Sequence, residues 1–272
     1  MLNFLSTYNF LVYGNPAYSR SLADSSTITK YFDITGGVDH YLDCPNDDFR
    51  LNSAIFNYAN DNNTICQLGY ELVSIFNSIH KVFCFKDFRR LPLRVEGFYL
   101  KDTIATLERK DTRFSINNFS HDEIELVEDV KSEILGLGDP SIFHFLLMSL
   151  IREDIYLILK LIDRIDLDSD DWSQIYKIFE TIENLESITS IGTQIDMILK
   201  RKFKNSANNF SITGIDSRHG YTSNPGGNQT LSYDEALAFI LDISQKYLKT
   251  LLVKIKSENE VNAFRLPLGS HR

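Results

Sequence analysis

The sequence predicts an α+β fold, in which an α+β module over residues 1–118 precedes an all-helical domain over residues 119–272. Short apolar runs separated by turn residues occur in the first part, and such runs are typical of strands. Beyond residue 118, apolar residues recur with the period of an α-helix. Strands and helices that fall in separate stretches favour α+β over an alternating α/β arrangement.

The first strands are expected near the N-terminus. The apolar run Phe4–Tyr13 ends at the turn cluster Gly14-Asn15-Pro16. Alternating apolar residues over 28–34 predict a second strand that stops at Gly36-Gly37.

A helix is expected over residues 60–83, because its apolar residues follow helical spacing and Thr64 is a suitable N-cap. Three short strands should follow it and form a β-meander that packs on this helix. They are expected over residues 93–99, 103–108 and 113–116.

The rest of the chain is predicted to be helical, and each helix follows a residue of the N-capping type. Gly136 and Gly138 should end the first of these helices. The second, which runs to about Ile165, is apolar nearly all round in its first half and is expected to be central. The expected caps are Ser120 with Glu123 as a capping box, Asp139 followed by Pro140, Ser169, Ser190, and Ser232 with Glu235 as a second capping box.

Composition narrows the class of protein. The content of 43% hydrophobic and 24% charged residues is that of a globular protein. The net charge of −9 disfavours strong non-specific binding to nucleic acid or to an anionic membrane, although a local basic patch can override it. The most apolar segment, Ile142–Ile151, is too short to span a bilayer, and the N-terminus lacks the features of a signal peptide. Cys44, Cys66 and Cys84 lack metal-ligand spacing, so we expect reduced thiols and a cytoplasmic location. From the net charge and the short apolar segment, we expect no membrane partner.

A calcium loop is begun by the acids Asp166, Asp168 and Asp170 but is not completed. The positions that require Gly and Glu hold Asp171 and Lys177. An acidic helix N-terminus explains these residues better.

Two other motifs are also incomplete. Glu108 and Lys110 resemble half of a metal-dependent nuclease site, but no well-placed partner acid accompanies them. Gly136-Leu137-Gly138 follows a helix instead of a strand, which argues against a dinucleotide loop. We therefore expect no metal site and no cofactor.

The lead candidate site is the pair Arg218-His219, in a loop between two C-terminal helices. Metal-independent cleavage of RNA needs a base for the 2′-hydroxyl and a cation for the charge that develops on phosphorus. Imidazole and guanidinium supply these groups. The upstream residues expected to contact RNA are Lys200, Arg201, Lys204, Asn205, Asn208 and Asn209.

A structural interpretation of the same residues stays open. Arg218 can bond the carboxyl ends of helices, and His219 can close a loop. The basic run Lys200–Lys204 can complement the dipole at the end of its helix. Phe203, within this run, is expected to point inward under either interpretation.

Between Asp171 and Leu252, about a third of the chain resembles a widespread group of uncharacterised bacterial proteins. The resemblance rests on the order and spacing of several short pieces, and the arrangement is similar to the helical domains of the HEPN superfamily. The pieces are Asp171-Trp172 with Ile175-Tyr176-Lys177-Ile178-Phe179-Glu180, Phe203-Lys204-Asn205-Ser206-Ala207-Asn208, Ser217-Arg218-His219-Gly220, and Leu231-Ser232-Tyr233-Asp234-Glu235-Ala236.

The resemblance implies a dimeric, metal-independent RNase of the phage-defence or toxin type, with His219 as the base and Arg218 as the phosphate contact. The HEPN motif separates its Arg and His by several residues, whereas Arg218 here directly precedes His219. Two hypotheses follow. One is an endoribonuclease acting as a homodimer. The other is a non-catalytic interaction or sensor protein whose helical domain dimerises or holds a partner, such as the product of a neighbouring gene.

Overall fold

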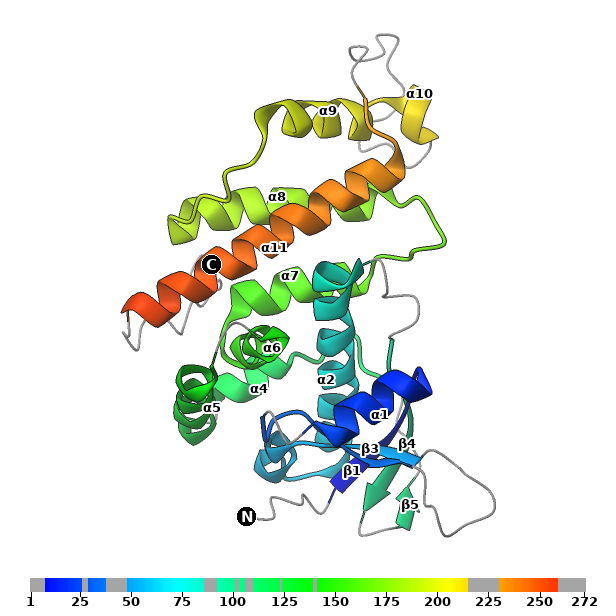
Figure 1. Ribbon diagram of the computed structural model, residues 1–272, viewed down its shortest axis with the longest axis vertical. Helices are drawn as coiled ribbons and strands as arrows, with labels where there is room; N and C mark the ends of the chain where they lie inside the picture. The colour runs from blue at the N-terminus through cyan, green and yellow to red at the C-terminus, as the bar shows by residue number, and fades with distance from the viewer. Residues whose placement is uncertain are drawn as a thin grey trace.

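A computed structural model describes residues 8–25, 29–37, 48–85, 92–100, 103–105, 110–122, 124–138, 141–214 and 230–258. These residues form the α+β fold that the sequence predicts, with an antiparallel sheet near the N-terminus followed by a series of helices. The molecule is elongated, and Figure 1 shows the sheet at one end and the last helices stacked toward the other.

Within the described residues, the sheet has five antiparallel strands in the order β2-β3-β1-β4-β5. Side chains alternate across it, so that Phe10 and Val12 of the central strand are fully buried and Tyr13 is exposed. The strands are β1 (Tyr8–Tyr13), β2 (Asp33–Gly37), β3 (Asp48–Asn52), β4 (Arg94–Leu100) and β5 (Thr103–Ala105).

One long helix, α2 (Asn62–Phe83), links the sheet to the other helices (Figure 1). It approaches β1 closely at Gly69, where an added Cβ would lie 2.4 Å from the Phe10 ring. Glycine is therefore required for this contact. The N-cap of α2 is Asp61, which accepts a hydrogen bond from the Thr64 amide, so the prediction of Thr64 as the cap is wrong.

Two short elements flank this part of the chain. Helix α1 (Pro16–Asp24) follows β1 and packs against β2, while the 3-10 helix η1 (Ala54–Tyr58) follows β3. Neither element, nor strand β3, was expected from the sequence. The turn signal Asn15-Pro16 is in fact a helix start, because Asn15 caps the Tyr18 amide and proline suits the first helical position.

Two strand predictions need correction. The strand expected over 28–34 begins at Asp33 and continues through Gly36 and Gly37, which adopt positive φ values and pair with β3. Residues 113–116 form no strand. A turn leads instead into helix α4 (Ile116–Asp122), in which buried Asn117 donates to the carbonyl oxygens of Ser149 and Leu150. The predicted β-meander is thus reduced to the hairpin of β4 and β5.

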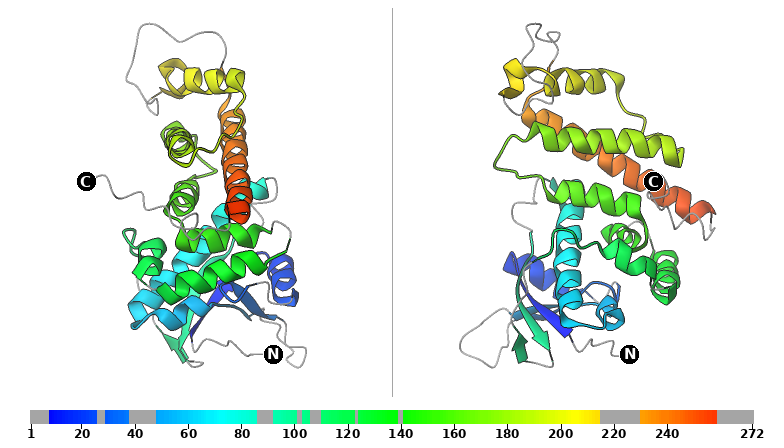
Figure 2. Two further views of the ribbon diagram at one scale, coloured as in Figure 1. Left: turned by 90° about the vertical axis from the view of Figure 1, so that its left-hand side faces the viewer. Right: turned by 180° about the vertical axis from the view of Figure 1, so that it is seen from behind.

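The remaining helices stack on one another. Helix α7 packs on α2, α8 packs on α7 and α11, and α9 packs on α8, as the two views of Figure 2 show. These helices are α5 (Ile124–Gly136), α6 (Ile142–Ile151), α7 (Glu153–Asp163), α8 (Trp172–Thr189), α9 (Met197–Ala207), α10 (Phe210–Thr213) and α11 (Tyr233–Glu258).

The helix predicted to run from Asp139-Pro140 to about Ile165 is divided into two helices, α6 and α7. The chain leaves the helical conformation between them at Arg152. Arg152 adopts an extended conformation there, and its guanidinium pairs with the Asp154 carboxylate inside the core. Helix α6 is almost entirely buried, which confirms the central position expected for it.

Some of the predicted helix caps are confirmed and others are wrong. The capping box of Ser232 and Glu235 is confirmed by reciprocal bonds to each other's amides at the start of α11. Ser120 lies inside α4, and Ser190 ends α8 with a positive φ instead of starting a helix. The caps found in place of those expected are Ser141 for α6, Asp171 for α8 and Asp196 for α9, whereas Glu123, Asp139 and Pro140 lie outside the described residues.

The buried core runs continuously from Phe10 in the sheet to Ile255 in α11. Residue 118, the predicted boundary, lies within α4. The division into residues 1–118 and 119–272 stays a prediction. Among the described residues, no helix combines the length and apolarity needed to cross a membrane.

Two buried histidines make the fold sensitive to acid. The fully buried His144 accepts a hydrogen bond at Nδ1 from the Ser141 amide at 3.0 Å, which completes a capping box for α6. Burial, followed by the charge of Lys256, lowers the pKa of His144, and burial also lowers the pKa of His80. Their contribution to stability is therefore complete above the unfolded pKa of about 6.5 and is lost as pH falls through the lower folded values.

We expect the free energy of unfolding in urea to decrease from about pH 7.5 to about pH 5. His144→Gln should make this decrease smaller, because Gln can accept the same capping bond without titrating. Because the pKa of His80 is also lowered, part of the pH dependence of the free energy of unfolding should remain in the variant. An identical pH dependence in the two proteins would show that His144 does not contribute.

Candidate functional site

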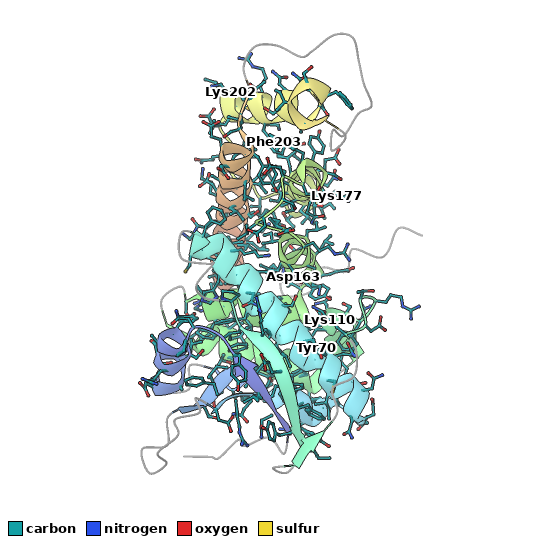
Figure 3. The ribbon with its side chains drawn as sticks, turned by 90° about the vertical axis from the view of Figure 1, so that its right-hand side faces the viewer. Tyr70, Lys110, Asp163, Lys177, Lys202 and Phe203 are labelled. Carbon is teal, nitrogen blue, oxygen red and sulfur yellow. The ribbon has the colours of Figure 1, made fainter. Side chains whose placement is uncertain are left out.

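Helix α9 carries the basic run that the sequence singles out. It begins at the cap Asp196, whose carboxylate accepts from the amides of Ile198 and Leu199. Phe203 is fully buried, as expected, among the rings of Tyr176, Phe179 and Phe239. Figure 3 shows Phe203 directed at the helices below α9.

Two of the predicted RNA contacts bind another helix. Glu183 of α8 accepts from Lys200 at 2.5 Å and pairs with Lys204 at 3.1 Å. Both ammonium groups also lie near the Phe179 ring, at 5.9 and 5.0 Å from its centroid. Hydrogen bonds and the charges of the two lysines lower the pKa of Glu183 against the opposing effect of burial. Lys200 and Lys204 thus hold α9 on α8.

The other basic side chains of the run face solvent to different extents. Arg201 is exposed and Lys202 is half-buried. Lys202 also lies close enough to α11 to contribute to the lowered pKa of Glu235, which is mainly due to hydrogen bonds with Ser232.

The asparagines after the basic run mostly shape the backbone. Asn208 ends α9, and its Oδ1 is buried without a hydrogen-bond partner among the described residues. Asn209 is buried and caps α10 by accepting from the Ser211 amide at 3.0 Å. Asn205 is half-buried.

Arg218 and His219 lie in residues 215–229, outside the described residues. The described residues on both sides of this segment are fixed to the carboxyl end of α9. On one side, Thr213 Oγ1 donates to the Asn209 carbonyl at 3.1 Å within α10, and the Asn209 amide donates to the Ser206 carbonyl of α9 at 3.0 Å. On the other, the Leu231 amide donates to Ser206 Oγ at 2.7 Å, and this hydroxyl also contacts the Leu231 carbonyl.

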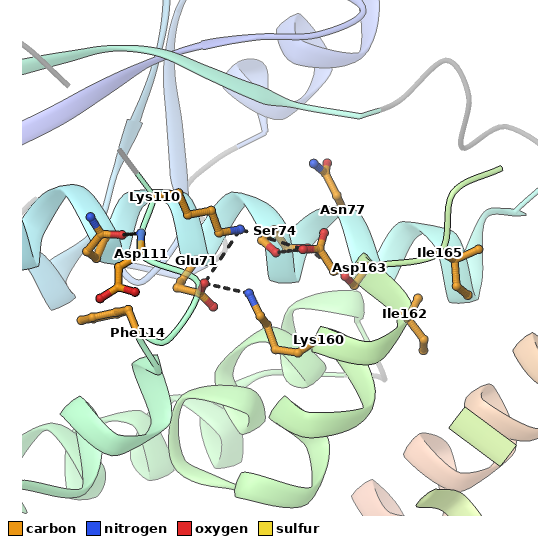
Figure 4. A network of polar contacts seen from close by, with 12 residues as sticks. Glu71, Ser74, Asn77, Lys110, Asp111, Phe114, Lys160, Ile162, Asp163 and Ile165 are labelled. Carbon is orange, nitrogen blue, oxygen red and sulfur yellow. Dashed lines mark hydrogen bonds and ion pairs between the residues drawn. The ribbon is translucent and has the colours of Figure 1, made fainter. Parts of the chain in front are cut away.

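A second cluster, which the sequence interpretation missed, lies where α2, α7 and residues 110–114 meet (Figure 4). Glu71, with 2% side-chain exposure, accepts from Lys160 Nζ at 2.7 Å and from the Tyr156 hydroxyl at 3.0 Å. Burial, followed by the charge of Glu71, raises the pKa of Tyr156. We call Glu71, Lys110, Tyr156, Lys160 and Asp163 the α2–α7 network.

Asp163 connects this network to a cavity of about 410 Å³. Its carboxylate accepts from Ser74 Oγ at 2.5 Å and lies 3.9 Å from Lys110 Nζ. The cavity is lined on one side by Asn77 and Lys81 of α2 and on the other by Asp163 and the chain that follows it.

Lys81 is a structural residue of this cavity wall. Its buried ammonium donates to the carbonyl oxygens of Ile162, Asp163 and Ile165, at 3.3, 2.9 and 2.9 Å. Three donors matched by three acceptors cap the carboxyl end of α7. Burial lowers the pKa of Lys81, although nearby Asp163 opposes this effect.

One signal in the sequence could have revealed the network. Glu71 and Lys81 interrupt the apolar helical pattern of α2, and both are buried. Charged residues are seldom buried unless they are paired. Their partners Lys160 and Asp163 are 89 and 82 residues away in the chain, so the pairing itself depends on tertiary structure.

The metal motifs gain no support from the described part of the chain, in which no group of His, Cys, Asp and Glu is arranged to hold a metal ion. Asp166 accepts from the Asp168 amide in the connection between α7 and α8, and Asp171 is the acidic N-cap of α8. Glu108 lies outside the described residues, and Lys110 is on no strand. Cys66 is buried and Cys84 is half-buried, both as free thiols, while Cys44 lies outside the described residues.

Comparisons of the chain with protein families, with curated proteins and with solved structures find no match.

Proposed function

We propose that the protein is a metal-independent endoribonuclease of the defence or toxin type, with Arg218 and His219 as its catalytic pair. The observation that supports this proposal is the attachment of α10 and of Leu231 to the carboxyl end of basic helix α9. The described residues that flank the segment carrying the pair therefore lie at this end of α9, and we propose that the pair acts together with the cationic side chains of the helix.

In the proposed mechanism, neutral His219 removes the proton of the 2′-hydroxyl, and the 2′-oxygen attacks the adjacent phosphorus. The P–O5′ bond breaks, the 5′-oxygen leaves with a proton from water, and a 2′,3′-cyclic phosphate remains. Arg218 stabilises the negative charge on the phosphoryl oxygens, and its planar guanidinium can bind two of them at once. Arg201 and Lys202 contribute to guiding RNA alongside Lys200 and Lys204, whose ammonium groups share the single carboxylate of Glu183. A cytoplasmic homodimer that brings two sites together completes the proposal.

The test is cleavage of mixed-sequence RNA in the presence of EDTA. We expect the wild-type chain to cleave and His219→Ala to lose about 10²–10⁴-fold in rate, the usual contribution of a general base. Arg201→Ser should weaken cleavage and reduce its dependence on salt, since it removes one phosphate contact. Equal cleavage by wild type and His219→Ala would place the activity elsewhere.

Before the rates are compared, circular dichroism should show that each variant is folded. Light scattering of the wild-type chain tests the proposed dimer independently. A monomer that cleaves RNA would retain the catalytic proposal and remove the dimer.

A non-catalytic interaction or sensor protein is the second candidate, and the surface of α9 favours it. Met197 and Ile198 at the start of α9 are 69% and 58% exposed, and Ile188 near the end of α8 is 57% exposed. Apolar side chains of this size are commonly covered in complexes. Absence of cleavage by a folded wild-type chain, together with stable binding of another protein, would favour this function.

A further inference from the structure

Lys110 is the cation of the α2–α7 network with the weakest pairing. Its Nζ lies 3.8 Å from Glu71 Oε1 and 3.9 Å from Asp163 Oδ2, which exceeds the usual hydrogen-bond distance. Both carboxylates already accept closer donors, from Lys160 and from Ser74. Within the described residues, the carboxylates are therefore satisfied without Lys110.

The charges of the network explain why Lys110 is held in this way. Lys160 and Lys110 share one oxygen of Glu71, and Lys81 lies near Asp163. Three ammonium groups thus surround two carboxylates, and the additional positive charge repels its neighbours. Burial, followed by the charge of Lys160, lowers the pKa of Lys110, against the opposing charges of Glu71 and Asp163.

The Lys110 side chain is partly exposed and adjoins the cavity through Asp163. Its exposed fraction is 34%. Asp163, which forms an ion pair with Lys110, also lines the cavity of about 410 Å³. Asp163, Asp166 and Asp168 line this cavity. Carboxylates accept hydrogen bonds from hydroxyl groups and repel anions, which favours a neutral, hydroxylated ligand over an acid or a phosphate ester.

We propose that Lys110 is a reactive amine that forms an imine with a small, neutral hydroxyaldehyde held in the adjoining cavity. The uncharged amine adds to the carbonyl carbon, and the carbonyl oxygen leaves as water with the two hydrogens of the amine. One C=N bond replaces one C=O bond, and no oxidant or reductant takes part. A desolvated lysine beside a second cation is a known arrangement for this chemistry.

Brief treatment of the full-length chain with glyceraldehyde and cyanoborohydride near pH 7 tests the proposal, because cyanoborohydride reduces the imine to a stable amine. Peptide mass spectrometry then gives the labelling rate at each lysine. Lys177, an exposed lysine of α8, is the internal reference, and Figure 3 labels both residues. We expect Lys110 to react at least about threefold faster than Lys177, since its amine is more often uncharged.

Two further changes separate this site from general reactivity. Lys160→Met should abolish the advantage of Lys110, because Glu71 then pairs with Lys110, whereas Lys160→Arg should retain it. Asp168→Trp places a large ring over an exposed part of the cavity wall and should slow labelling of Lys110 but not of Lys177.

A rate at Lys110 no greater than that at Lys177 would overturn the proposal, and so would an undiminished rate in Asp168→Trp. The Asp168 variant changes an exposed residue, so the test remains decisive even if Lys160→Met fails to fold. None of these outcomes depends on cleavage of RNA by Arg218 and His219.

Discussion

Replacement of Asp154 by alanine is expected to lower the free energy of unfolding by about 3–5 kcal/mol, because it removes the carboxylate that pairs with the buried charge of Arg152. Asp154 is fully buried and Arg152 is 3% exposed. Arg152 Nε donates to one carboxylate oxygen at 2.9 Å and Nη2 donates to the other at 2.7 Å. The Tyr247 hydroxyl of α11 donates to the same carboxylate at 3.1 Å, so the pair joins three helices.

Urea unfolding monitored by circular dichroism measures this effect. Tyr247→Phe is the matched control and should cost about 1 kcal/mol, since it removes one hydrogen bond and leaves the ion pair intact. The double variant Arg152→Met with Asp154→Leu should recover most of the lost stability, because no buried charge remains. A loss below about 1 kcal/mol in Asp154→Ala would show that Arg152 reaches water once its partner is removed.

The second large effect is expected at Phe203, whose replacement by alanine should destabilise the docking of α9 by about 3–5 kcal/mol. Phe203 is fully buried, and its ring centroid lies 5.1 Å from that of Phe179 and 5.5 Å from that of Phe239. These rings belong to α8 and α11, so one side chain attaches α9 to both helices.

Hydrogen exchange read peptide by peptide measures this local opening. Phe203→Ala should increase exchange over residues 197–207 far more than in α2, and Phe203→Leu should have a smaller effect because it retains much of the apolar volume. Unchanged protection of α9 in Phe203→Ala would indicate that the bonds of Glu183 to Lys200 and Lys204 suffice to hold it. Under the proposed function, cleavage of RNA should decrease with loss of α9 docking.

The helix caps show which features of the structure local sequence signals can predict. Ser232 and Glu235 were identified correctly because a capping box is completed within four residues. Ser190 has the same capping chemistry but ends α8. The next residue, Ile191, is buried, and the chain that follows it is not helical. Several residues in this region can cap a helix, and packing selects among them.

The candidate sites show the same limit. The inward position of Phe203 followed from its spacing, but the pairing of Lys200 and Lys204 did not, because Glu183 lies on a different helix. The α2–α7 network was missed for a related reason. The ion-pair neighbours of Lys110 in the described part of the chain, Glu71 and Asp163, come from distant segments.

The sequence by itself determined the α+β class, the apolar face of α2, the central burial of α6 and the start of α11, because each depends on a short-range pattern of apolar or capping residues. The tertiary structure decided the order of the strands, the bend at Arg152, the partners of the basic residues of α9 and the assembly of the α2–α7 network. These features depend on burial and on charges brought together from distant segments, and the free energy of pairing them in the interior has no counterpart in local sequence.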